Sequence, residues 1–261
     1  MPPQQSNKVK AKATLAKIHE RNISAFFRTQ GAMVLRAISR RSLSAARSFE
    51  SPSLWSISPE EWDLIWQNIT NQTTPDLSKI IAAAEADGLH AGSEQLRKAI
   101  GLFNEKSTFN LANPRAVAWF QENGGSVEYI KGIQKTTGGQ IRSIVTNALN
   151  TGQAYTVTAK EIQGAFDGMT RDRAQRIAVF ETGQAYEAGN RLFAESLVDD
   201  GVKMQERWVT SHDEKVRPEH AANEAEGWVE LGHVYSSGDT DCPTDPGCRC
   251  YKEYRQAPEG D

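Results

Sequence analysis

Apolar residues recur at three- and four-residue steps through most of the first 200 residues, which is the period of helices that bury one face. Proline, glycine and capping residues divide this pattern into predicted helices near residues 10–49, 58–73, 74–102, 113–123, 140–149, 158–166 and 170–200, with residues 126–135 either a short helix or irregular. Short β-prone runs appear only afterwards, at residues 203–210, 228–231 and 249–255. The sequence therefore predicts a mainly α protein with a small C-terminal module that contains β-strands.

Local signals mark several of these helices. Ser58-Pro59-Glu60-Glu61 predicts a capped helix start, and Gly201 predicts a left-handed stop. Trp62 and Trp66 lie on one apolar stripe, where they either pack in a core or anchor a partner. Small residues at 82–84, 88 and 92 predict close helix approach, and residues 102–111 predict a linker.

Charge is unevenly distributed along the chain. The 261 residues carry a formal net charge of -3, yet residues 1–50 hold ten Lys or Arg against two Asp or Glu, a net of +8. One interpretation is a basic arm that contacts DNA or an acidic protein surface, and the other is the solvated face of a long helix with an apolar stripe from Leu15 and Ile18 to Leu43. The candidate contact residues are Lys8, Lys10, Lys12, Lys17, Arg21 and Arg28.

The sequence gives no signal for a membrane partner or for secretion. No window approaches the roughly 18 apolar residues of a spanning helix, and the N-terminus lacks an apolar signal region. Three cysteines without such a signal indicate a reducing compartment, where a disulfide framework is not expected.

All three cysteines lie within nine residues near the C-terminus, which indicates shared chemistry. His220, Cys242, Cys248 and Cys250 form one candidate structural zinc site, with His212 or His233 as substitutes for His220. A second interpretation has one cysteine packed inside a strand near a hydrogen-bonded His220, and a third has an oxidised pair that includes Cys242. Four such ligands would close the site, which argues against zinc-dependent hydrolysis.

Asp213 and Arg217 are four residues apart beside Trp208, and we expect them to shape the loop through a salt bridge. Arg217 has a second candidate partner in Glu181 of the preceding helix.

The order W-V-x-x-x-D, then R and H, then a Gly/Pro-rich loop and CRC resembles the C-terminal module of the phage Mu F-like head morphogenesis family. The matching positions are Trp208, Asp213, Arg217, His220, Pro246, Cys248, Arg249 and Cys250. Residues 168–189 resemble the family's preceding helix, with Glu181 at its glutamate and with Val179-Phe180 where the family more often has Arg-Thr. The resemblance covers roughly residues 113–255.

This resemblance implies a non-enzymatic minor head protein of a tailed phage, assembled in the bacterial cytoplasm and retained inside the capsid. The portal, the major capsid protein or a scaffolding protein would be its partners, with a part in DNA packaging or ejection. We expect a basic docking region at residues 1–110 and the family domain at 111–261, with helices to residue 200 and the β/Cys module after it. The alternatives are a DNA-binding accessory protein and a zinc-dependent hydrolase or nuclease.

Overall fold

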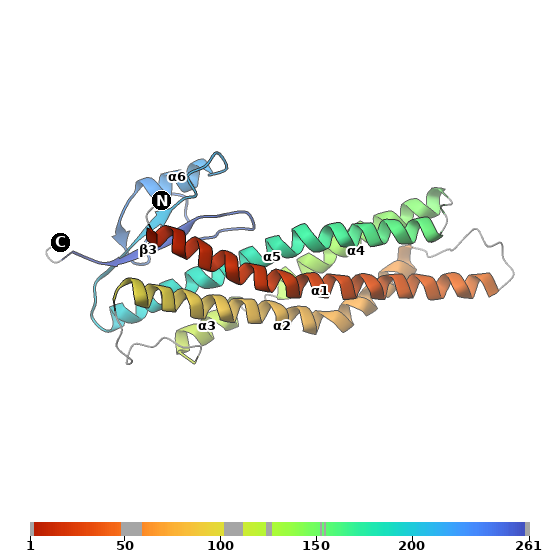
Figure 1. Ribbon diagram of the computed structural model, residues 1–261, viewed down its shortest axis with the longest axis horizontal. Coiled ribbons are helices and arrows are strands. Elements are labelled where there is room, and N and C mark those ends of the chain that lie inside the picture. Colours follow the sequence, from red (N-terminus) through yellow and green to blue (C-terminus); the bar gives the residue numbers. More distant parts are fainter. Residues whose placement is uncertain are drawn as a thin grey trace. The chain divides into compact units, whose positions relative to one another are not determined.

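The computed structural model describes residues 3–47, 59–101, 112–123, 127–151, 153 and 155–258. Within these ranges it contains six helices and three strands, so the predicted mainly α fold with a small β-containing module is confirmed (Figure 1). In chain order the elements are α1 (Pro3–Arg47), α2 (Pro59–Ala99), α3 (Pro114–Asn123), α4 (Val127–Thr151), α5 (Tyr155–Asp199), β1 (Met204–Val209), α6 (Pro218–Ala225), β2 (Val229–Glu230) and β3 (Tyr251–Gln256).

The chain divides into two compact units, each assembled from separate stretches of sequence. Unit 1 comprises Met1–His19, Ile81–Gly124 and Arg176–Asp261, and unit 2 comprises Glu20–Ile80 and Gly125–Gln175. Helices α1, α2 and α5 each contribute residues to both units. The boundary predicted at residues 110 and 111 remains a prediction.

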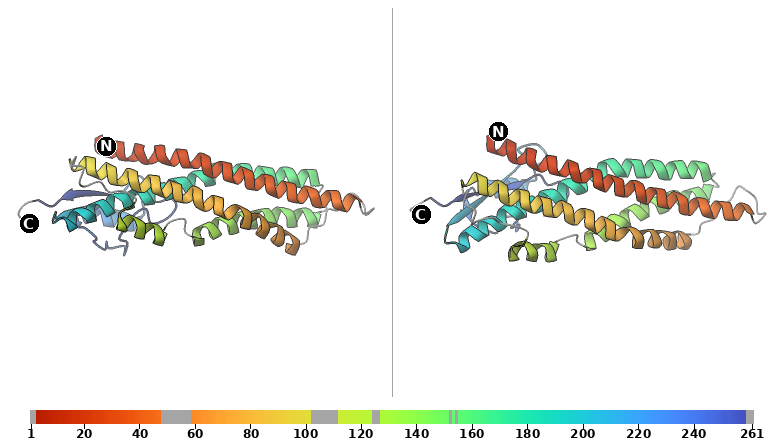
Figure 2. Two further views of the ribbon diagram at one scale, coloured as in Figure 1. Left: turned by 90° about the horizontal axis from the view of Figure 1, so that it is seen from below. Right: turned by 60° about the horizontal axis from the view of Figure 1, so that its bottom comes forward.

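Unit 2 is a helical bundle of segments from α1, α2, α4 and α5, which can be followed in the two views of Figure 2. Its core contains Val34, Ile38, Trp62, Ile69, Ile141, Val145, Ala148, Ile162 and Phe166. Trp62 is buried and stacks on Trp66 with ring centroids 6.0 Å apart, so these tryptophans pack in the core. Inside the bundle, Gln30 donates a hydrogen bond to Thr73, which links α1 to α2.

Unit 1 brings α2 and α5 into very close contact. A side chain at Gly92 would run into the carbonyl of Tyr186, and one at Gly189 would run into the carbonyl of Leu89. The predicted close approach of small residues on α2 is therefore confirmed. Around this contact, a core of α2, α3 and α5 residues includes Leu89, Leu96, Trp119, Leu192 and Phe193.

The sheet of unit 1 has the order β2-β1-β3, and all of its pairs are antiparallel. All three predicted β-runs contain a strand. The central strand β1 places Trp208 opposite Lys252 of β3, and both side chains are almost completely buried. Lys252 forms a 2.8 Å ion pair with the buried carboxylate of Glu206, which supplies the opposite charge that a buried ammonium requires. Gly201 ends α5 with a φ of 84°, as predicted.

Three predicted helix breaks are wrong. Helix α2 continues through Pro75, α4 continues through Gly138-Gly139, and α5 runs without a break from Tyr155 to Asp199. Pro75 is exposed, so its ring lies outside the buried face of α2. Gly138 is needed in α4 because any side chain there would meet Trp66. Tertiary packing therefore overrides the local break signals.

The buried stripe of α1 differs in part from the predicted one. Val34 is completely buried as predicted, but Ile18 is half exposed, and Ile23 and Phe27, outside the predicted stripe, are completely buried. The side chain of Leu43 and the linker predicted at residues 102–111 lie outside the described residues. Among the residues that are described, no helix combines the length and the apolar character needed to cross a bilayer.

Candidate metal centre

His220 is presented by α6, a short helix that we did not predict. Arg217 has extended backbone angles just before it, and Pro218 occupies the first turn, where a missing N–H costs nothing. Pro218 followed by Glu219 is a helix-start signal that would have identified this element. The helix directs His220 toward the loop that leads from β2 to β3, which carries the cysteines.

His220, Cys248 and Cys250 converge on one point. The Nδ1 atom of His220 lies 3.5 Å from Sγ of Cys250 and 3.8 Å from Sγ of Cys248. The three potential ligand atoms all lie within 4.8 Å of one another. Three of the four predicted zinc ligands are therefore adjacent.

The surroundings fix the imidazole of His220. The ring of Trp208 lies 5.3 Å from it, centroid to centroid, and its Nε2 atom faces the carboxylate of Asp239 at 4.0 Å. His220 and Cys250 are buried, and Cys248 is partly exposed. Because Trp208 sits in the central strand, the sheet holds the ring in position.

Cys242 lies outside this group of ligand atoms. Its side chain is buried in the apolar cluster formed with Trp208, Tyr235 and Cys250, and burial raises the pKa of its thiol well above the ordinary value. The two substitute histidines are engaged elsewhere, because His212 contacts Glu224 at 2.7 Å and His233 contacts Glu226 at 2.8 Å. In the structure, all three cysteines are free thiols.

The two adjacent thiols have very different proton affinities. A hydrogen bond from Cys250 lowers the pKa of Cys248 to about 5, and the same hydrogen bond raises the pKa of Cys250. Near neutral pH the pair therefore holds one thiolate and one thiol, which is a nucleophilic and metal-binding state.

The expected salt bridge between Asp213 and Arg217 is replaced by two others. Arg249 donates to both carboxylate oxygens of Asp213, one of them at 2.7 Å, and Arg217 donates to both oxygens of Asp245 at 2.6 and 2.9 Å. The Arg249 guanidinium lowers the pKa of Asp213 to about 2. Both pairs tie the segment before α6 to the cysteine loop, so a four-residue spacing in an irregular segment did not indicate contact.

Glu181 does not pair with Arg217 as proposed, because it lies beside Glu85 of α2. Both carboxyl groups are buried. Burial and the neighbouring Glu85 carboxylate, together with a hydrogen bond between the two groups, raise the pKa of Glu181 to about 8. The two carboxyl groups therefore share a proton at neutral pH.

We expect the substitution Glu181→Gln to stabilise the protein increasingly as pH rises. The folded protein keeps a proton that the unfolded chain releases above its ordinary pKa of 4.5, so this contribution to stability is complete below that value and is lost as pH rises toward 8. Glutamine mimics the protonated form at every pH. Urea unfolding between about pH 5 and 8 should show the variant gaining a few kcal/mol over wild type.

The exposed carboxyl of Glu122 provides the control for this experiment. A Glu122→Gln variant should differ from wild type by the same small amount at each pH. A Glu181→Gln variant with the same flat difference would show that the Glu181–Glu85 pair does not share a proton.

Two of the six predicted contact residues are buried or paired inside unit 1. Lys8 contacts Glu187 of α5 at 3.0 Å and donates to the carbonyl of Lys252 at 2.6 Å, and Lys12 contacts the other oxygen of Glu187 at 2.9 Å. Lys8 and Lys12 are therefore engaged within the protein in this structure, and their role in binding a partner stays a prediction. Lys10, Lys17, Arg21 and Arg28 are exposed on α1.

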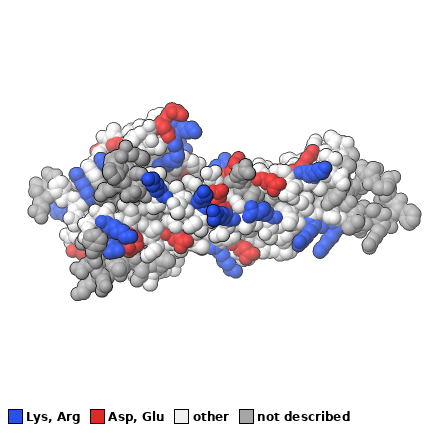
Figure 3. Space-filling view, in the orientation of Figure 1, with Lys and Arg blue, Asp and Glu red and all other residues white. Residues whose placement is uncertain are grey.

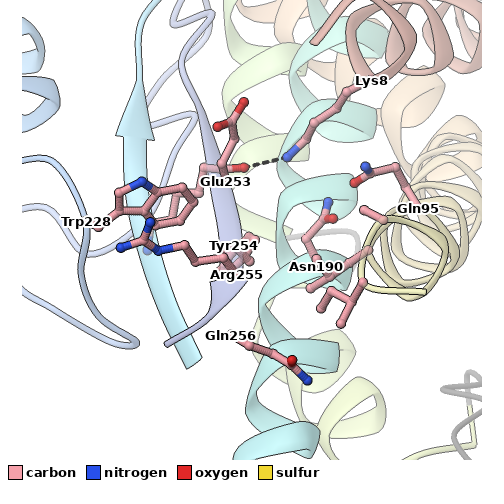
Figure 4. A pocket seen from close by; sticks show the side chains of 12 residues that line it. Lys8, Gln95, Asn190, Trp228, Glu253, Tyr254, Arg255 and Gln256 are labelled. Carbon is pink, nitrogen blue, oxygen red and sulfur yellow. Dashed lines mark hydrogen bonds between the residues drawn. The ribbon is translucent and has the colours of Figure 1, made fainter. Parts of the chain in front are cut away.

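A separate hollow of about 380 Å³ lies in unit 1 between β3, α2 and α5. Figure 4 shows Asn190 and Gln95 on its helical side and Trp228 and Arg255 on its sheet side. The guanidinium groups of Arg255 and Arg207 lie 4.3 and 4.8 Å from the Trp228 ring. Its lining mixes cations, a carboxylate and amides.

Several residues of the site had no local signal in the sequence. Asp239, Asp245 and Glu85 approach their partners from distant segments, and charge alone did not distinguish them from other acidic residues. Only a spatial arrangement identifies such contacts.

Residues 139–252 match the model of the family described as Phage Mu protein F like protein. The match includes α6, the cysteine loop and most of the sheet, and it confirms the resemblance predicted from the sequence. The match also supports a general role of the chain in phage head morphogenesis. No curated protein and no solved structure matches the chain.

Proposed function

From the membership of residues 139–252 in the Phage Mu F-like family, we propose that this protein is a minor head protein of a tailed phage. It is incorporated during procapsid assembly, near the portal and inside the capsid, and it contributes to DNA packaging or ejection. The observation that carries this proposal is the family match over the module that holds His220, Cys248 and Cys250.

The construction of unit 1 supports an assembly role. Lys8 of its N-terminal segment joins α5 and the sheet, because its ammonium pairs with Glu187 and donates to the carbonyl of Lys252, and the pair of Lys252 with Glu206 links β3 to β1 inside the sheet. A rigid module of this kind suits repeated docking in a particle. Two carboxylates at its surface, Asp213 and Asp245, are engaged in ion pairs with Arg249 and Arg217.

The exposed cations of α1 are suited to a partner with negative charge. Lys10, Lys17, Arg21 and Arg28 are available, and basic and acidic side chains lie interspersed on the face drawn in Figure 3. A mixed surface favours an acidic protein partner over a continuous DNA track, which would require an extended basic stripe. We therefore propose that the partner of these cations is the portal, capsid or scaffolding protein, and DNA is the second candidate.

The experiment that tests this function compares DNA-free procapsids with filled heads of the phage that encodes the chain. Both particles are purified, washed in high salt and quantified for this protein by mass spectrometry. We expect a low, fixed copy number in both, because docking to a head protein precedes packaging.

Two other outcomes are informative. Presence only in DNA-filled heads would assign the attachment to DNA, which supports the accessory DNA-binding alternative. Absence from both particles would overturn the proposed function.

A further inference from the structure

We propose that His220 Nδ1, Cys248 Sγ and Cys250 Sγ bind one zinc ion, whose fourth coordination position faces a small hollow and takes a water molecule. This site differs from the closed four-ligand site expected from the sequence, because Cys242 is not a ligand. It is independent of the proposed head function, since it depends only on the geometry of unit 1.

The distances match those of a tetrahedral zinc site. With zinc–sulfur bonds of about 2.3 Å and zinc–nitrogen bonds of about 2.0–2.1 Å, tetrahedral angles place nitrogen and sulfur ligands about 3.6 Å apart. The two observed separations between His220 Nδ1 and the sulfurs are 3.5 and 3.8 Å. Both nitrogen–sulfur separations therefore already match the spacing that the ion requires, and the two sulfur atoms lie within 4.8 Å of each other.

The type and the support of these ligands favour zinc. Thiolates and imidazole together bind zinc in preference to magnesium or calcium, which bind oxygen. Ligating histidines usually present their other nitrogen to a carboxylate or carbonyl, and here Nε2 of His220 faces Asp239 at 4.0 Å. The ring of Trp208 and the central strand hold the imidazole against rotation.

The fourth position is open to a hollow of about 40 Å³ beside the ligands. Ser211, Lys215, Arg217 and Gly247 line this hollow together with the ligand residues and Arg249. A space of this size has room for a water molecule, which needs roughly 10–15 Å³ of such volume. We therefore assign water to this position.

Cys242 is the residue that separates this site from the four-ligand alternative. It is 2% exposed and belongs to the apolar cluster around Trp208 and Tyr235. Cys250 belongs to the same cluster, but its sulfur lies 3.5 Å from Nδ1 of His220, whereas the sulfur of Cys242 is not among the ligand atoms that converge there. The structure thus predicts that a Cys242 variant keeps the metal and that variants of the other three residues lose it.

The test uses the full-length protein, purified under reducing conditions without chelator. Plasma mass spectrometry is expected to find about one equivalent of zinc. X-ray absorption at the zinc edge is expected to fit two sulfur and two nitrogen or oxygen ligands. Replacement by Co²⁺ should give the absorption of a tetrahedral ion with a thiolate charge-transfer band.

Variants then identify the ligands. His220→Ala and Cys250→Ser each remove a ligand. Loss of a hydrogen bond that only supports a ligand weakens metal affinity by about 10–100-fold, so each of these variants should weaken zinc affinity by more than that. Cys242→Ser is the matched control and should bind as wild type does. Affinity is measured by competition with a chromophoric chelator, and circular dichroism checks that each variant is folded.

Two results would overturn the proposal, and both come from the wild-type protein. Less than about a tenth of an equivalent of zinc, with no uptake of added Zn²⁺ or Co²⁺, would exclude the metal. Three sulfur ligands in the absorption spectrum would exclude the open position and assign Cys242 to the site. Neither result depends on the folding of a variant.

Discussion

Replacing Gly189 with alanine is expected to destabilise unit 1 by more than about 3 kcal/mol, at the upper end of the cost of overpacking. The added methyl group would overlap the backbone carbonyl of Leu89 on α2. A backbone atom within a helix cannot rotate away as a flexible side chain does, so the two helices must separate. Urea unfolding followed by circular dichroism, or soluble yield where the variant does not fold, measures this effect.

Gly183 provides a matched control on the same helix. A methyl group there would meet only Pro243, at an ordinary contact distance of 3.9 Å. Gly183→Ala should therefore be neutral or stabilising by about 0.5–1 kcal/mol, since alanine favours a helix. If Gly189→Ala matched Gly183→Ala, α2 and α5 could not lie as close together as described.

Much of the fold follows from local signals. Asn113 before Pro114 starts α3, and its side chain accepts a hydrogen bond from the backbone of Arg115. Gly201 ends α5, and all three β-prone runs contain strands. These features were predictable because each depends on a few neighbouring residues.

The wrong predictions came from local signals that packing overrides. Pro75 and Gly138-Gly139 are breakers by themselves, yet α2 and α4 continue through them. Buried apolar residues lie on both sides of each signal, Ile69 and Leu77 in α2 and Ile133 and Ile141 in α4. The interpretation in which the two tryptophans pack in a core was correct, since Trp62 is buried in the core of unit 2. Helix type was therefore predictable, whereas helix length was not.

The site was predictable in its residue types and not in its pairings. Clustering of cysteines beside a histidine identified His220, Cys248 and Cys250, which the structure brings together. The sequence could not show that Cys242 would point into the apolar cluster or that Lys8 would reach Glu187, 179 residues away. Such contacts arise from tertiary structure and leave no spacing to detect.

The buried ion pair of Lys8 gives the second large effect, and we expect Glu187→Gln to destabilise the protein by about 3–5 kcal/mol. Glu187 is buried, and it contacts Lys8 and Lys12 at 3.0 and 2.9 Å. Burial raises the pKa of Glu187, but Lys12 and Lys8 outweigh burial and hold its pKa below the ordinary value. Glutamine keeps the shape and removes the charge, so Lys8 is left buried without its counterion. Urea unfolding measures the loss.

An exposed pair on the same helix separates burial from charge. Asp199 is 60% exposed and contacts Arg115 at 2.6 Å. Asp199→Asn is therefore expected to cost less than about 1 kcal/mol, because water already screens that pair. Adding Lys8→Met to Glu187→Gln should restore much of the lost stability, since the more deeply buried of the two ammonium groups beside residue 187 is then removed and only the partly exposed Lys12 remains. If Glu187→Gln cost no more than Asp199→Asn, the N-terminal segment of α1 would not be docked through Glu187, and Lys8 and Lys12 would again be available to a partner.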